Sequence, residues 1–254
     1  MSRVLLQTHD LTVRFGGHVA VDHVSCSFRA GELTAIVGPN GAGKTTYFNL
    51  ISGQIPASEG KVELNGRDIT RMSVSQRCER GIGRAFQLTN LFPNLSVLEN
   101  VRLVIQAKAK MGFNLFSMVE SHSEVTDRAI SVLEKVRLYD LREQKVSELS
   151  HGNQRKLEVA MLIALDPLVY MFDEPTAGMS VDEAPVVLDL IAELKAEKDR
   201  TILLVEHKMD VIRTLADRII VLHNGALAAD GDPAEVMASD VVQEAYMGKE
   251  LEDV

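Results

Sequence analysis

The feature that most constrains the fold is the octapeptide GPNGAGKT at residues 38–45. It follows the apolar run 33–37, which is typical of a strand buried on both faces of a parallel sheet. It precedes a segment with apolar residues at helical spacing that ends at Gly53. A bare pattern of this kind also occurs as an ordinary glycine-rich turn. With a strand before it and a helix after it, the octapeptide predicts a phosphate-binding P-loop.

Each residue type in this loop suits a polyphosphate. The glycines Gly38, Gly41 and Gly43 allow the backbone to curl, so that successive N–H groups point inward beside a helix N-terminus. Lys44 can reach the β- and γ-phosphates, and the Thr45 hydroxyl can bind Mg²⁺. The residues predicted to surround the phosphates are Gly38, Pro39, Asn40, Gly41, Ala42, Gly43, Lys44, Thr45 and Thr46.

Three later apolar runs, at 168–172, 201–205 and 218–222, resemble the strand before the P-loop. Helical patterns separate them, and one lies between Ser180 and Lys198, where Ser180 and Glu183 predict a capping box at the helix start. Buried strands that alternate with helices indicate an α/β fold with a mainly parallel sheet.

Two other regions have a different character. The first thirty residues read as alternating strands, which predict a separate N-terminal β subdomain. Residues 88–165 have little strand character and contain helical stretches at 96–110, 123–137 and 150–165. We therefore expect a helical subdomain to be inserted into the α/β core.

Carboxylates follow the second buried run directly. Asp173 and Glu174 stand at its C-terminal end, which is the ligand-binding edge of a parallel sheet. Asp173 is placed to hold Mg²⁺, and Glu174 is placed to orient or deprotonate the water that attacks a γ-phosphate. His207 follows the strand 201–205 at the same edge, which favours a role in the site over a solvated histidine.

Charge and composition exclude several classes of protein. The formal net charge of −9 argues against a general nucleic-acid binder, and no apolar run approaches the ~18 residues of a membrane helix. The chain begins without a signal-peptide pattern, and Cys26 and Cys78 fit no metal-ligand spacing, so we expect reduced thiols in the cytosol. Residues 230–254 hold eight acidic residues and one basic residue, which makes an acidic tail.

The middle of the chain is basic instead. Residues 71–112 hold seven basic residues and two acidic ones, together with apolar residues such as Phe86 and Phe92. A basic rim around an apolar patch suits docking on a membrane subunit near anionic lipid, through residues such as Arg77 and Arg80. A solvated helical subdomain with a small core of its own is the alternative.

A further motif lies in the third helical stretch. Ser150 is placed as the N-cap of a helix in the segment LSHGN, 149–153, and such a cap presents a hydroxyl and free amides to an anion. The order GPNGAGKTT, Gln87, LSHGN, VYMFDEP and His207 resembles the ATP-binding-cassette (ABC) ATPases over essentially the whole chain. The combination is far more specific than any one motif.

The resemblance implies a single P-loop NTPase domain over 1–254 with a RecA-like core. Its nucleotide-binding core would comprise 1–87 and 166–229, its helical subdomain 88–165, and its acidic helical tail 230–254. It also implies a head-to-tail dimer that binds two ATP molecules. Each ATP lies between the P-loop of one subunit and the segment 149–153 of the other, which is called the signature segment. ATP and Mg²⁺ are the ligands that the family binds.

The family's residue roles transfer by position. Phe15 would stack on adenine, although from the sequence alone it reads more readily as a core aromatic. Gln87 would contact Mg²⁺ together with Thr45 and Asp173. Catalysis would fall to Glu174, which polarises water, to His207, which contacts the γ-phosphate, and to Lys44. The signature residues that would face the partner's ATP are Ser150, His151, Gly152 and Asn153.

The chain departs from the family pattern at two places. His151 and Asn153 replace the usual glycine and glutamine of the signature, and an imidazole in place of glycine demands more room beside the phosphate. Ser180 stands where the family pattern has an aspartate that makes a contact across the dimer.

Three stretches resemble the ATPases of branched-chain amino acid importers: 84–101, 203–212 and 230–250. Urea and short-amide importers are the near alternative, and a lipid or lipopolysaccharide exporter shares every catalytic motif. The importer resemblance implies partner membrane permeases, a second ATPase subunit, which makes a homodimer or heterodimer, and a periplasmic or extracellular solute-binding protein. The chain would then act as a peripheral protein at the cytoplasmic face of the membrane.

Other classes fit less well. A GTPase is disfavoured because no N/T-K-x-D motif is present, and a small-molecule kinase has no need of LSHGN. A soluble cassette ATPase acting on DNA or ribosomes would usually carry long coiled coils or two cassettes in tandem, and this chain has neither.

Overall fold

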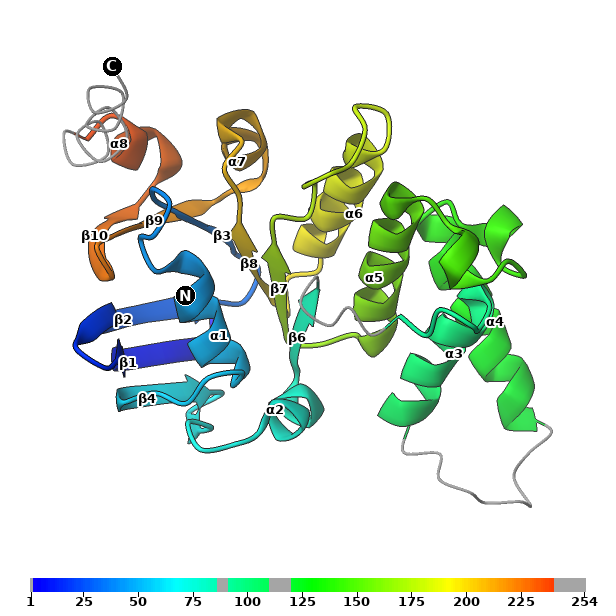
Figure 1. Ribbon diagram of the computed structural model, residues 1–254, viewed down its shortest axis with the longest axis horizontal. Helices are drawn as coiled ribbons and strands as arrows, with labels where there is room; N and C mark the ends of the chain where they lie inside the picture. The colour runs from blue at the N-terminus through cyan, green and yellow to red at the C-terminus, as the bar shows by residue number, and fades with distance from the viewer. Residues whose placement is uncertain (1, 86–90, 110–119, 240–254) are drawn as a thin grey trace. The chain divides into compact units, whose positions relative to one another are not determined.

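The computed structural model describes residues 2–85, 91–109 and 120–239 (Figure 1). Gln87 and most of the acidic tail lie outside these residues. The chain divides into two compact units. Unit 1 comprises Met1–Ile82, Leu168–Glu174 and Lys195–Val254, and unit 2 comprises Gly83–Pro167 and Pro175–Leu194. Unit 2 therefore contains the later segment Pro175–Leu194 as well as the middle of the chain.

Unit 1 begins with an antiparallel sheet whose strand order is β2-β1-β4-β5. Its strands are β1 (Val4–Phe15), β2 (His18–Arg29), β4 (Glu59–Leu64) and β5 (Arg67–Asp68). Strand β1 is continuous from Val4 to Phe15, although its pairing with β2 shifts register between Thr8 and Leu11. Asp10 has a φ of 44° at this irregularity, and its N–H donates to Ser25 Oγ over 2.7 Å.

The second sheet of unit 1 has the order β10-β9-β3-β8-β7. Its strands are β3 (Leu33–Val37), β7 (Val169–Asp173), β8 (Thr201–Val205), β9 (Arg218–His223) and β10 (Ala226–Gly231). The first four are mutually parallel, and β10 is antiparallel to β9. All four apolar runs predicted as buried strands are confirmed. A further strand, β6 (Ile82–Ala85), contains the point at which the chain passes from unit 1 to unit 2.

The helices of unit 1 are α1 (Lys44–Ser52), α2 (Val74–Arg80), α7 (Met209–Leu215) and α8 (Pro233–Met237). Helix α1 ends at Gly53, as predicted, and Figure 1 shows it between the two sheets. Its aromatic side chains Tyr47 and Phe48 are fully buried in a core with residues of both sheets. A smaller core on the other face of β3 and β9 includes Ile212 of α7 and Val236 of α8.

Unit 2 is helical, with α3 (Val97–Lys108), α4 (Glu120–Lys135) and α5 (His151–Leu165) in contact with one another. Over the described residues, these helices confirm the three helical stretches predicted at 96–110, 123–137 and 150–165. Two short 3₁₀ turns, Tyr139–Leu141 and Val146–Glu148, connect α4 to α5. At the end of α5, Asp166 accepts a hydrogen bond from Lys108 Nζ over 2.8 Å.

The helix predicted from Ser180 starts later than expected. Helix α6 spans Ala184–Ala196, and a turn precedes it. Ser180 Oγ donates to Glu183 Oε2 over 3.1 Å and Ser180 N donates to the same atom over 3.3 Å. The backbone bond is one half of a capping box, but the Ser180 hydroxyl donates to the Glu183 carboxylate and does not accept a backbone N–H, so it does not cap α6. Pro185 lies in the first turn of α6, where its missing N–H costs no helical hydrogen bond.

The docking hypothesis also requires a correction, because Arg77 is 2% exposed. Its guanidinium donates to the carbonyls of Leu50 and Ile51 over 2.6 Å each, at the C-terminal end of α1. It also donates to the carbonyls of Thr70 and Met72. Burial lowers the pKa of Arg77 to about 10. Arg77 thus stabilises the P-loop helix from within, and only Arg80 of the two is exposed.

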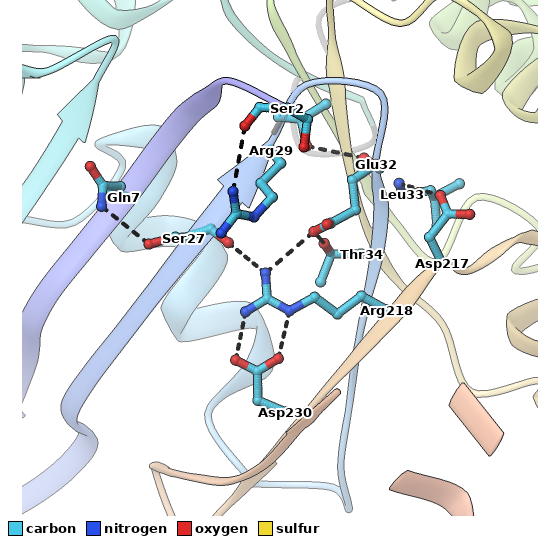
Figure 2. A network of polar contacts seen from close by, with 11 residues as sticks. Ser2, Gln7, Ser27, Arg29, Glu32, Leu33, Thr34, Asp217, Arg218 and Asp230 are labelled. Atoms are coloured by element: carbon cyan, nitrogen blue, oxygen red, sulfur yellow. Dashed lines mark hydrogen bonds and ion pairs between the residues drawn. The ribbon is translucent and has the colours of Figure 1, made fainter. Parts of the chain in front are cut away.

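A second arginine joins three strands, β2, β9 and β10, at the opposite edge of the parallel sheet from the P-loop. Arg218 at the start of β9 binds both carboxylate oxygens of Asp230 in β10 and contacts Glu32 Oε1 at 3.3 Å (Figure 2). It also donates to the carbonyl of Ser27 in β2. The bidentate bond with Asp230 raises the pKa of Arg218 above its ordinary value. This network connects the antiparallel sheet to the parallel sheet within unit 1.

No helix in the described part of the chain has the length and apolar character needed to cross a bilayer.

Candidate active site

The P-loop, Asp173, Glu174 and His207 lie at one edge of the parallel sheet of unit 1. In register, Val205 of β8 lies opposite Ile36 of β3 on one side and opposite Asp173 of β7 on the other. Because these strands are parallel, the segments that follow them leave the sheet at the same edge. The P-loop after β3, Glu174 after β7 and His207 after β8 are brought together in this way.

The P-loop requires glycine at three positions. Gly38, Gly41 and Gly43 have φ values of 148°, 81° and 96°, a region that residues with a Cβ rarely adopt. A Cβ on Gly38 would lie 2.1 Å from the Leu222 carbonyl oxygen, and a Cβ on Gly43 would lie 2.5 Å from that of Ala20. Backbone from β9 and β2 thus presses directly on the loop, so its curl is set by neighbouring strands as well as by its own residues.

Helix α1 begins at Lys44 with no side-chain cap at Gly43, and the N-terminus of a helix favours a bound anion. Lys44 is 7% exposed, and its Nζ donates to the carbonyls of Gly38 and Pro39 over 2.6 and 2.9 Å. The positive charge of Lys44 therefore lies inside the curl of the loop. Thr45 is exposed at the start of the helix.

Glu174 and His207 form a direct pair. His207 Nε2 lies 2.8 Å from Glu174 Oε1, and both side chains are partly exposed, at 40% and 44%. Glu174 has a φ of 50°, and its N–H donates to the Val205 carbonyl over 2.9 Å. A glutamate with left-handed backbone dihedral angles is strained, and such strain is concentrated at functional sites. Glu206, which is buried, accepts the His207 N–H over 2.8 Å.

Phe15 is not a core aromatic. It lies at the end of β1 opposite His18, and it is 53% exposed. The core interpretation that the sequence favoured is therefore wrong. The hairpin that carries Phe15 includes Ala20, whose carbonyl contacts the P-loop at Gly43, so the exposed ring and the loop belong to connected elements.

The signature segment lies in unit 2. Ser150 is the N-cap of α5, as predicted, and its Oγ accepts the Asn153 N–H over 3.3 Å. His151 is exposed and Gly152 is buried. A Cβ on Gly152 would lie 2.1 Å from Glu183 Oε2, so the Glu183 carboxylate packs directly against this glycine. The sequence predicted a capping role for Glu183 and not this contact.

The structure gives two further residues a place beside the site. The buried Glu206, which belongs to the importer-like stretch 203–212, orients the backbone at His207. Gly225, which the sequence did not single out, contacts the P-loop through its backbone. The dipeptide Asn224–Gly225 signals a turn, but no local pattern shows which loop that turn contacts. Gln87, predicted to contact Mg²⁺, lies outside the described residues.

The comparisons with known proteins agree on one family. A family model described as ABC transporter matches residues 21–177. The high-affinity branched-chain amino acid transport ATP-binding protein LivG of Salmonella typhimurium is 37% identical over 98% of this chain and 100% of its own length.

Solved structures give the same result. An ATP-binding cassette of an ABC transporter in its ADP conformation is 31% identical, with a TM-score of 0.82 over 97% of this chain and 100% of that one. A cassette dimer in a post-hydrolysis state, bound to ADP and phosphate, is 26% identical, with a TM-score of 0.78 over 90% of this chain and 99% of that one. The fold is thus that of an ABC cassette, whose P-loop NTPase core binds ATP. Given these matches and the geometry of the P-loop, Glu174 and His207, the chain belongs to the ABC transporter family as an ATP-hydrolysing subunit, whose partners are membrane permeases and a second ATPase subunit.

Proposed function

We propose that this chain powers the import of branched-chain amino acids through partner membrane subunits. The observation that carries the proposal is the similarity to LivG. The similarity extends over 98% of this chain and is therefore not confined to the nucleotide-binding motifs. That span includes the regions 84–101 and 203–212, which contain Gln87 and His207 and resemble those of branched-chain amino acid importers. A periplasmic or extracellular solute-binding protein would supply the solute, and the chain would act at the cytoplasmic face of the membrane.

In this proposal the described residues divide the work at the nucleotide. The amides of the P-loop and Lys44 bind the phosphates, and Phe15 stacks on adenine. Glu174 holds the attacking water and accepts its proton. His207 keeps the Glu174 carboxylate in place through its 2.8 Å contact and reaches toward the γ-phosphate. Ser150, His151, Gly152 and Asn153 face the ATP bound by the other subunit.

The residues at the sheet edge fit a magnesium ion. The described residues contain no group of three or more His, Cys, Asp and Glu side chains suited to a metal. Mg²⁺ needs no such cage, because it is usually bound by one or two protein oxygens, substrate phosphates and water. Thr45 and Asp173 would supply those oxygens, and Gln87 a third. When bound, the ion neutralises charge on the β- and γ-phosphates.

The test is ATP-dependent uptake by the reconstituted transporter. The chain would be combined in proteoliposomes with the membrane subunits, sister ATPase and binding protein of its own transport system. We expect uptake of labelled leucine that requires internal ATP and that is lost with Glu174→Gln, the matched control. Uptake of urea or acetamide in place of leucine would contradict the proposed solute while leaving the ATPase assignment intact. Co-purification with lipid-export permeases would contradict import itself.

A further inference from the structure

We infer that Gly225 is a positioning residue that sets the spacing between the P-loop and the β1–β2 hairpin that carries Phe15. Gly225 lies in the turn between β9 and β10 and is buried. Its N–H donates to the Ala42 carbonyl of the P-loop over 3.1 Å. Its carbonyl accepts the Asp22 N–H of β2 over 2.8 Å. One residue thus binds both elements through its backbone.

No other residue fits at this position without displacement. Gly225 has a φ of 80°, and a Cβ added to it would lie 2.9 Å from the Ala20 carbonyl oxygen and 3.1 Å from the Ala20 carbonyl carbon. Both atoms are backbone, which cannot rotate away as a side chain can. The position where a Cβ of Gly43 would stand is itself 3.4 Å from Gly225 Cα. The turn, the P-loop and β2 therefore meet at backbone distance.

This spacing matters because a nucleotide touches both elements. The inference rests on the proposed function, in which the P-loop binds the phosphates and Phe15 binds the base. A side chain at Gly225 would push β2 away from the P-loop, or would tilt the loop. A ligand that contacts both elements then loses contact at one end, while a ligand that contacts the P-loop alone loses less.

The structure offers a matched control in the β4–β5 turn. Asn65 and Gly66 have φ values of 51° and 72°, close to the 50° and 80° of Asn224 and Gly225. A Cβ on Gly66, however, would meet nothing within 4 Å. Gly66→Ala therefore imposes the same backbone strain as Gly225→Ala without the collision. The difference in nucleotide affinity between the two variants therefore measures the effect of the contact with β2.

The experiment uses calorimetry to measure the Kd of two ligands. The first is ADP, which the chain does not hydrolyse, and the second is inorganic pyrophosphate, which lacks the base. We expect Gly225→Ala to raise the Kd for ADP by about tenfold or more, and to raise that for pyrophosphate less. We expect Gly66→Ala to leave both values within about twofold of the wild type. Equal ADP affinity in the two variants, or equal losses for ADP and pyrophosphate in Gly225→Ala, would overturn the inference. A wild-type chain that binds no ADP would contradict the proposed site itself.

Amide hydrogen exchange on the wild-type chain provides a second test that does not depend on a variant's folding. The N–H groups of Asp22 and Gly225 are expected to exchange more slowly when ADP is bound, although neither is proposed to touch the nucleotide. Slower exchange in the P-loop with no change at Asp22 and Gly225 would show that the turn does not couple the two elements.

Discussion

His207 Nε2 contacts Glu174 Oε1 at 2.8 Å, although the two residues are 33 positions apart in the chain. The pairing follows from the sheet, because β7 and β8 are parallel neighbours with Asp173 opposite Val205. The Glu174 N–H extends this contact by donating to the Val205 carbonyl. The left-handed backbone of Glu174 then directs its carboxylate to the imidazole. This pair is the part of the proposed site that is most open to direct testing.

The first prediction concerns the carboxylate. Glu174→Gln keeps the size of the side chain and a group that can contact His207, but it removes the negative charge that accepts a proton. We expect steady-state ATP hydrolysis to fall by about 100-fold or more, with nucleotide affinity unchanged. Phosphate release and calorimetric ATP binding measure the two effects. Hydrolysis at the wild-type rate would refute the role of Glu174.

The second prediction concerns the imidazole. His207→Ala leaves Glu174 without its partner, so the carboxylate is no longer oriented, and we expect kcat to fall by about 100-fold with a much smaller change in KM. His9→Ala is the control, because His9 lies 3.5 Å from Glu63 in another histidine–carboxylate pair on β1 and β4. We expect that variant to hydrolyse ATP normally. Equal losses in the two variants would mean that His207 has no specific role.

The third prediction concerns the buried arginine. Arg77→Met removes four hydrogen bonds to backbone carbonyls and leaves those of Leu50 and Ile51 poorly satisfied. We expect the free energy of unfolding to fall by about 3 kcal/mol. Arg80→Met, on the exposed surface of the same helix, should change it by no more than about 0.5 kcal/mol. Urea unfolding measures both. If Arg80→Met were the more costly of the two, Arg77 would not stabilise α1 as described.

The fourth prediction concerns pH. Burial raises the pKa of the Cys26 thiol from 9.0 to about 11. The folded protein therefore keeps this proton between pH 9 and 11, where the unfolded chain loses it. The free energy of unfolding should fall with rising pH in this range, at up to roughly 1.4 kcal/mol per pH unit from this group.

Cys26→Ala isolates that contribution. The stability difference between the wild type and this variant should narrow as the pH rises from 9 to 11, because only the wild type loses stability through the thiol. Urea unfolding at several pH values measures the difference. A difference that stays constant across the range would contradict the burial effect.

The sequence by itself determined the features that depend on neighbours along the chain. The buried strands, the P-loop glycines, the cap at Ser150 and the end of α1 at Gly53 follow from local sterics, capping and hydrophobic periodicity, which act within a few residues. The sequence also predicted membership of a family of ATPases, because that prediction depends only on the order of short motifs.

Only the tertiary structure decided the features that depend on which strands are neighbours. It shows Phe15 as exposed and Arg77 as buried, because no element among the described residues covers the hairpin tip and α2 packs beside the end of α1. It pairs Glu174 with His207 and places Gly225 against the P-loop, because β7 lies beside β8 and β9 lies beside β3. These contacts join residues far apart in the chain, and no local pattern encodes the strand order that creates them.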